Sequence, residues 1–197
     1  VLAALVDHKL KELDFKLTMS HEVEFIGYNH PDGRRTYLRS LCFVLQNAVR
    51  ELFPEKVLII DHSLPSGLYC NICEVKLCED GRRTPLKLSD NDIDAIRNRM
   101  REIVDADMPF EKRKMDAVEA ELLFDNNNQP DKAELQRSLG KFLCSVYFLD
   151  GKADTFHGPL LHSTGALKVF DLIPFAQGFC LQFPSEGDFS KVIPVKT

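Results

Sequence analysis

The residues around a Gly-Pro turn near the C-terminus are the first in this chain that could do chemistry. Asp154, His157 and His162 surround Gly158-Pro159, and a carboxylate with two imidazoles offers hydrogen bonds of both kinds to a small ligand. The spacing of the two histidines is not typical of metal ligands. These three residues are candidates for binding a ligand, and we expect none of them to be catalytic. The pattern is more typical of histidines in a surface loop than of a functional site.

Three cysteines form a second candidate site. Cys70, Cys73 and Cys78 have the spacing Cys-x2-Cys-x4-Cys, whereas a structural zinc site needs four ligands. Cys70 and Cys73 lie three apart in a predicted strand, so their side chains face opposite sides of it. The pattern favours thiols that pack in a core over thiols that bind a metal.

The run Asp61-His-Ser63 contains the three residue types of a nucleophilic triad. A triad is assembled from side chains that the fold orients toward one another, and three neighbours in sequence do not meet this condition. We therefore expect no nucleophile here.

Three basic runs could contact phosphate groups. They are Arg34-Arg35 with Arg39, Arg82-Arg83 with Lys87, and Lys112-Arg113-Lys114. Acidic residues separate them, which is typical of solvated loops and helix faces. Arg39 and Lys87 are the strongest candidates for binding an anion. The chain has no Gly-x4-Gly-Lys-[Ser/Thr] motif and so no phosphate cradle of that kind.

The composition is that of an ordinary globular protein. Of the 197 residues, 44% are hydrophobic and 28% are charged. The net charge of -5 is a poor basis for binding nucleic acid over a broad surface. No apolar run approaches the roughly 20 residues that span a bilayer, so we expect no membrane partner.

Two features bear on location and on the extent of the chain. The six cysteines fit a reducing compartment better than a disulfide scaffold, and we expect the protein to be cytoplasmic. The chain does not begin with Met, and its first residues lack the basic start of a signal peptide. We expect it to be a piece of a longer protein.

Hydrophobic periodicity predicts an α+β fold. Strands are predicted at 2–6, 13–17, 23–27, 57–60, 68–77, 144–149, 166–170 and 178–183, with a turn at 29–33 and a hairpin-like loop at 78–83. Helices are predicted at 38–52, 116–124 and 132–139. A long helix is predicted from Ser89 to Asp105, ahead of Pro109, and Ser89 and Asp92 form a near capping box at its start. Residues from 185 onward lack core signals.

The segment Asp154-Thr-Phe-His-Gly-Pro-Leu160 resembles the Asp-x-Cys-x-Gly-Pro-His segment of the second additional domain of threonyl- and alanyl-tRNA synthetases. In that family the Cys and the His are two of four metal ligands. The family helix that carries the other two, His-x3-His, aligns through Leu52-Phe-Pro54. The four positions are Arg39, Phe43, Phe156 and Leu160 in this chain. None of these side chains can bind zinc, so the resemblance implies a degenerate metal site and no catalytic residue.

The resemblance extends over most of the chain. Residues 38–184 resemble the synthetase editing domain, an antiparallel sheet packed with helices. The matches are the helix at 39–54, the run Gly67-Leu-Tyr69, the helix end at 102–110, and Gly158-Pro159 with Thr164-Gly165. Residues 1–37 resemble the second half of a TGS domain, a small β-grasp module. This implies a β-grasp remnant, an editing-domain-like module and, at 185–197, a linker toward a further domain.

This combination resembles the front half of bacterial uridine (nucleoside) kinases that are sometimes described as threonyl-tRNA synthetase-like. The runs 34–45 and 103–110 carry that likeness. It implies a non-catalytic accessory module that binds a small ligand, an RNA or the downstream kinase domain. ATP and magnesium would belong to that kinase domain, and this chain would need no cofactor. The alternatives are an active synthetase-type editing hydrolase and a spacer that fixes kinase oligomerisation.

The two aromatic residues at former ligand positions lead to one structural prediction. We expect Phe43 and Phe156 to pack together in the old metal cleft, because two apolar rings there gain from leaving water. Arg39 and His157 would bound this cluster.

Overall fold

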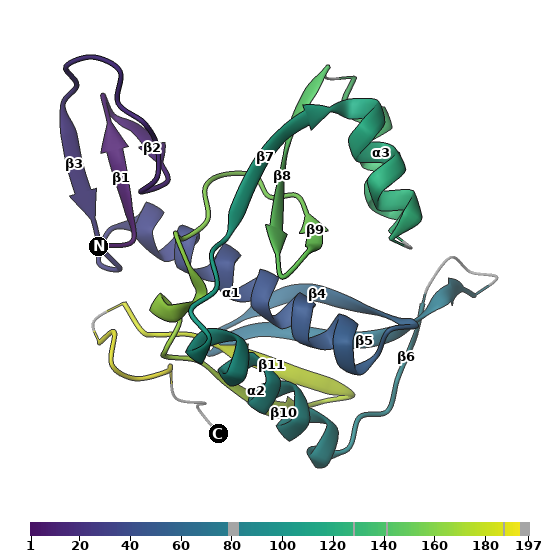
Figure 1. The fold of residues 1–197 in the computed structure, drawn as a ribbon. Helices are drawn as coiled ribbons and strands as arrows, with labels where there is room; N and C mark the ends of the chain where they lie inside the picture. Colours follow the sequence, from purple (N-terminus) through teal and green to yellow (C-terminus); the bar gives the residue numbers. More distant parts are fainter. Residues whose placement is uncertain (79–82, 128, 141, 187, 194–197) are drawn as a thin grey trace.

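The computed structural model describes residues 1–78, 83–127, 129–140, 142–186 and 188–193. Within them the fold is α+β, as the sequence predicts, with three antiparallel sheets and four α-helices (Figure 1). No helix in this part of the chain is long and apolar enough to cross a bilayer.

The largest sheet carries the main core. Its strands follow the order β10-β11-β5-β4, and β6 pairs with β5. Their bounds are Lys56–Leu64 for β4, Gly67–Leu77 for β5, Arg83–Pro85 for β6, Asp171–Phe175 for β10 and Gly178–Gln182 for β11. Helices α1 (Pro31–Leu52) and α2 (Asp90–Asp105) lie over one face of this sheet (Figure 1). Leu41, Ile72 and Ile96 meet in the fully buried layer between them.

Helix α1 begins at Pro31, so the predicted turn at 29–33 and the predicted start at 38 are wrong. The His30 ring caps the helix and accepts a hydrogen bond from the Asp32 backbone at 3.2 Å, and proline is favoured in the first turn. At Gly33 a Cβ atom would lie 1.9 Å from the Gly27 carbonyl oxygen, so only glycine fits. The predicted segment boundary at residue 37 falls inside α1.

Helix α2 confirms the predicted cap. Ser89 accepts from the Asp92 backbone, and the Asp92 carboxylate accepts from the Ser89 backbone at 2.8 Å, which completes a capping box. The stripe Ile93, Ile96, Met100, Ile103 and Val104 is buried. The helix ends at Asp105, as predicted.

The N-terminal residues form a separate small sheet of order β2-β1-β3. Its strands are β1 (Ala3–Val6), β2 (Lys9–Lys11) and β3 (Val23–Ile26). The predicted strand at 13–17 is wrong. Leu13, Phe15 and Leu17 do alternate in sequence, but they are 39%, 42% and 50% exposed and pair with no strand. That this sheet is a β-grasp remnant stays a prediction.

A third sheet, β7-β8-β9, stands beside the main layer with its own small core. Its strands are Glu111–Asp116, Leu143–Leu149 and Lys152–Asp154, and helices α3 (Ala117–Asn126) and α4 (Pro130–Leu139) pack with it. Phe124 and Val146 are the fully buried centre of that core. Strands β2, β6, β7 and β9 were not predicted from the sequence.

The predicted strand at 166–170 is also wrong. A short 3-10 turn, Thr164–Ala166, stands at its start, and the true strand β10 follows at Asp171. The turn is anchored because the Thr164 hydroxyl donates to the Ile103 carbonyl at 2.7 Å. The hairpin-like loop predicted at 78–83 lies largely outside the described residues.

The segment after β11 returns to the body of the fold although its sequence shows no core signal. Phe189 packs on Tyr28 and Tyr37 with ring centroids 4.7 and 5.5 Å apart. The Tyr28 hydroxyl donates to the Pro184 carbonyl at 2.5 Å. A role of residues 185–197 as a linker stays a prediction.

Candidate functional site

Phe43 and Phe156 lie together, with ring centroids 5.2 Å apart. Phe43 projects from the middle of α1, is fully buried, and also stacks on Phe110 at 5.9 Å. Phe156 follows β9, is partly buried and meets the Tyr147 ring edge-on at 6.1 Å. Apolar rings therefore occupy the space between α1 and the segment after β9.

Arg39, one helical turn before Phe43, holds the Gly-Pro turn through its backbone. Its guanidinium donates two hydrogen bonds to the Pro159 carbonyl, at 2.9 and 3.1 Å, and one to the Thr36 hydroxyl. Gly158 has a φ of +117°, and a Cβ there would lie 3.0 Å from the Arg39 guanidinium carbon. Burial lowers the pKa of Arg39. This arginine braces the turn.

The four positions that the resemblance assigns to metal ligands thus come together without ligand chemistry. Arg39 and Phe43 share one face of α1, and Leu160 is fully buried in the same core as Phe43. Throughout residues 1–197, wherever the structure describes them, no three His, Cys, Asp or Glu side chains are placed to hold a metal ion. A zinc ion does not fit this side-chain set.

Asp154 has partners that the sequence analysis missed. Its side chain is 2% exposed. Arg50 donates to one carboxylate oxygen at 3.2 Å, and Lys132 pairs with the other. The Thr155 backbone donates to Asp154 at 2.7 Å. The carboxylate is therefore fixed between a cation from α1 and a cation from α4.

The two histidines are separate from Asp154. His157 and His162 are both exposed, and their side chains make no hydrogen bond or ion pair with any residue that the structure describes. His157 lines a shallow pocket with Leu135, Leu143 and Phe156, so it does border the aromatic pair. The predicted trio of Asp154, His157 and His162 is not joined by a contact.

Arg50 and Lys132 open onto a pocket of about 730 Å³ beside β4. Burial lowers the pKa of Arg50 and the pKa of Lys132, although the nearby Asp154 carboxylate favours both charged forms. The lining also holds Glu55 and Arg83. With Asp154 and Glu74 counted, its four cations stand against three carboxylates, an excess of one positive charge. Lys56, also in the wall, is neutralised by Glu74 at 2.8 Å. The excess charge favours an anion as occupant.

The other sequence candidates do not join these groups. Lys87 is exposed on the connection between β6 and α2. Cys70 and Cys73 are buried free thiols, and burial raises the pKa of each, which agrees with packing. His62 contacts Asp61 at 3.1 Å, and both are exposed.

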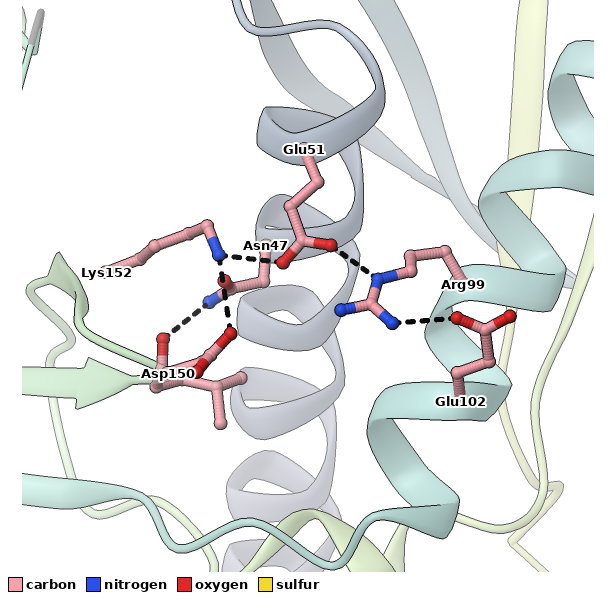
Figure 2. Close-up of polar contacts among 7 residues, drawn as sticks. Asn47, Glu51, Arg99, Glu102, Asp150 and Lys152 are labelled. Atoms are coloured by element: carbon pink, nitrogen blue, oxygen red, sulfur yellow. Dashed lines mark hydrogen bonds and ion pairs between the residues drawn. The ribbon is translucent and has the colours of Figure 1, made fainter.

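A network of charged residues ties the third sheet to helices α1 and α2 (Figure 2). Glu51 of α1 accepts from Lys152 at 2.7 Å and from Arg99 of α2. One turn earlier, Asn47 is 1% exposed and donates to the Leu149 carbonyl at 3.5 Å. Its amide oxygen has no hydrogen-bond partner among the described residues. Through these contacts Glu51 links α1 to α2 and to β9.

Replacing Glu51 with Gln is expected to lower the free energy of unfolding by about 1–2 kcal/mol at pH 7, because it weakens two charge-assisted contacts. Burial raises the pKa of Glu51, but hydrogen bonds from Arg99 and Lys152 outweigh it, so the folded-state pKa is lowered. A lowered carboxyl pKa contributes stability that is present above the unfolded pKa of about 4.3 and is lost as pH falls through the folded pKa. Urea unfolding of both proteins at pH 7 and pH 3 tests this: a difference that does not shrink at pH 3 contradicts it.

The comparisons with known proteins agree with the resemblance to threonyl-tRNA synthetases. No family model matches the chain. It is 30% identical to the threonine–tRNA ligase of Pelobacter propionicus over 178 residues, which is 90% of this chain and 26% of that protein. It is 30% identical to that of Halorhodospira halophila over 175 residues, 88% of this chain and 26% of the relative. The ligase of Syntrophotalea carbinolica is 28% identical over 179 residues, 90% of this chain and 27% of the relative.

Fold and similarity together define a threonyl-tRNA synthetase-like domain. The chain spans about a quarter of the length of the curated relatives that it matches. The likeness covers nine-tenths of this chain, including the helix of Phe43 and the segment of Phe156.

Proposed function

We propose that this chain is a non-catalytic, ligand-binding domain of threonyl-tRNA synthetase type. The observation that carries the proposal is the Phe43–Phe156 ring pair at positions that would have to supply metal ligands. Metal-assisted hydrolysis needs a polarising ion or a general base beside the attacking water. Two phenyl rings supply neither and exclude water from that space.

The pocket beside Asp154 supports an anionic small molecule as the ligand of this domain. Arg50 and Lys132 can donate to a carboxylate or phosphate while Asp154 keeps them in place. Apolar parts of Val57, Leu58 and Ile59 line the same pocket, which suits a ligand with an apolar portion.

We also propose that the domain stands at the front of a longer protein whose downstream domain is an ATP- and magnesium-dependent nucleoside (uridine) kinase. The likeness of runs 34–45 and 103–110 to that group supports this. The six free thiols support a reducing, cytoplasmic location. The sequence of the full-length protein tests the identity of the downstream domain. A P-loop there would support the kinase, and class II synthetase motifs would contradict the kinase proposal.

The purified protein is expected to contain no stoichiometric transition metal. Arg39, Phe43, Phe156 and Leu160 offer no thiolate, imidazole or carboxylate. Elemental analysis after dialysis against zinc checks this, with a zinc-dependent synthetase fragment as positive control. One zinc per chain would contradict the degenerate-site interpretation.

The domain is expected not to hydrolyse seryl-tRNA of the threonine type. The measurement is release of radiolabelled serine from mischarged tRNA, with an editing-competent threonine–tRNA ligase as positive control. The likeness to those ligases makes editing the alternative function. Deacylation above background, abolished by Asp154→Asn or Lys132→Met, would establish that alternative instead.

A further inference from the structure

A second cleft, of about 590 Å³, lies between the segment after β2 and the β7–β8 strands. It shares no lining residue with the pocket beside Asp154. Phe156, Gly158 and Pro159 form part of its wall, so it opens over the aromatic pair. In Figure 1 the N-terminal sheet lies at the upper left and the third sheet at the upper right.

Positive charge gathers in this cleft although the chain as a whole carries -5. Its ionisable lining is Lys11, Lys16, Lys112, Lys114, Glu12 and Asp14, four cations against two carboxylates, which leaves two positive charges. The Glu12 carboxylate already has partners within the protein, because Lys112 forms an ion pair with it at 2.8 Å and the Tyr147 hydroxyl donates a hydrogen bond to it.

The strand geometry aims two of these lysines into the cleft. Lys112 and Lys114 are two apart on β7, so they share a face. Their cross-strand partners on β8, Tyr147 and Ser145, line the same cleft. Arg113, between them, points to the other face and lies over Phe148 at 4.4 Å. The alternation separates a cleft-facing pair from a residue engaged elsewhere.

Two lysines that line the cleft have ammonium groups without an ion-pair or hydrogen-bond partner among the described residues. Within the described residues, Lys16 and Lys114 make no ion pair or hydrogen bond, whereas Lys112 has Glu12. Lys11 lies 4.5 Å above the Phe15 ring. Phe15 is 42% exposed and lines the cleft. An exposed ring beside unpaired ammonium groups offers a stacking platform together with phosphate contacts.

We propose that this cleft binds a nucleotide, with the phosphate held by Lys16 and Lys114 and the base stacked on Phe15. The shared chemistry is a flat heteroaromatic ring joined to a phosphate. It is supplied both by a free mononucleotide and by one unit of single-stranded RNA. Because the chain as a whole carries a net charge of -5, binding of a polyanion depends on a local positive patch such as this one.

Titration of the whole chain with uridine 5′-monophosphate by calorimetry, and with a fluorescein-labelled eight-residue oligouridylate by anisotropy, separates the two sources. The double variant Lys16→Glu, Lys114→Glu is expected to weaken binding at least tenfold and to flatten its salt dependence. Phe15→Ala is expected to weaken it about tenfold, as for loss of one stacked base. The matched control is Lys76→Glu, Lys168→Glu, which makes the same charge change at exposed lysines outside the cleft.

Each outcome decides the proposal. Binding of the mononucleotide, lost in the cleft variant, assigns the cleft to free nucleotides; binding of the oligonucleotide alone assigns it to RNA. Binding of neither probe overturns the proposal. Equal weakening by the control variant also overturns it, because attraction would then depend on overall charge. Circular dichroism of Phe15→Ala and of both double variants confirms that the fold is intact. The zinc and deacylation assays that test the proposed function do not depend on Phe15, Lys16 or Lys114. A failure of the nucleotide proposal can therefore be distinguished from a failure of the proposed function.

Discussion

Replacing Phe43 with Ala is expected to lower the free energy of unfolding by about 3–5 kcal/mol, the usual cost of truncating a fully buried aromatic side chain. Phe43 is 0% exposed and contacts the rings of both Phe110 and Phe156. Truncation removes these contacts and leaves a cavity between α1 and the segment after β9. Urea unfolding monitored by circular dichroism measures the change.

The neighbouring ring of Phe156 provides an internal comparison for the Phe43→Ala measurement. Phe156 is only partly buried, so Phe156→Ala is expected to cost less than Phe43→Ala, about 1–3 kcal/mol. Phe43→Leu, which keeps most of the volume, should recover much of the loss. If Phe43→Ala unfolds like the parent protein, the rings do not stabilise the fold and the proposed conversion from metal site to packing fails.

The elements that local sequence predicts well are those whose residues carry their own boundary signals. Helix α2 is the clearest case, since Ser89 and Asp92 mark its start and a stripe of five apolar residues marks its buried face. Helix α1 was placed correctly at its end but begins earlier, because His30 acts as the cap and Pro31 opens the first turn. Histidine is not among the usual capping residues.

Strands were harder to predict because their partners are distant. The alternation of Leu13, Phe15 and Leu17 indicated a strand, but no partner pairs with it in the fold. Conversely, the charged strand β7 (Glu111–Asp116) has no apolar pattern and is held by its ladder with β8, residues 143–148. Register between segments that far apart cannot be seen in either segment alone.

The candidate site divides in the same way. The contact between Phe43 and Phe156 was predicted, because the resemblance placed both residues at one site and buried apolar rings pack against each other. The partners of Asp154 were not predicted, because Arg50 lies 104 residues before it in the sequence. The burial of Asp154, which requires a cation nearby, is visible only in the fold.

Replacing Asp154 with Ala is expected to lower the free energy of unfolding by about 3–5 kcal/mol, the usual cost of removing one partner from a buried ion pair. The substitution leaves Arg50 and Lys132 facing each other with no carboxylate between them. The matched control is Asp105→Ala, an exposed carboxylate at the end of α2, which should change stability by less than about 0.5 kcal/mol.

The loss should depend on pH in a direction that identifies its cause. Burial already lowers the pKa of Lys132, and Asp154 opposes that effect. Without Asp154 the folded-state pKa of Lys132 falls further below its unfolded value of about 10.4. Between those two values the unfolded state binds more protons than the folded state, so the stability of the variant rises with pH. Urea unfolding from pH 7 to pH 10 should show the gap to the parent protein narrowing. A gap that stays constant would mean that Asp154 stabilises the fold through the hydrogen bond that its carboxylate accepts from the Thr155 backbone N–H. It would then not act as the counter-charge of Arg50 and Lys132.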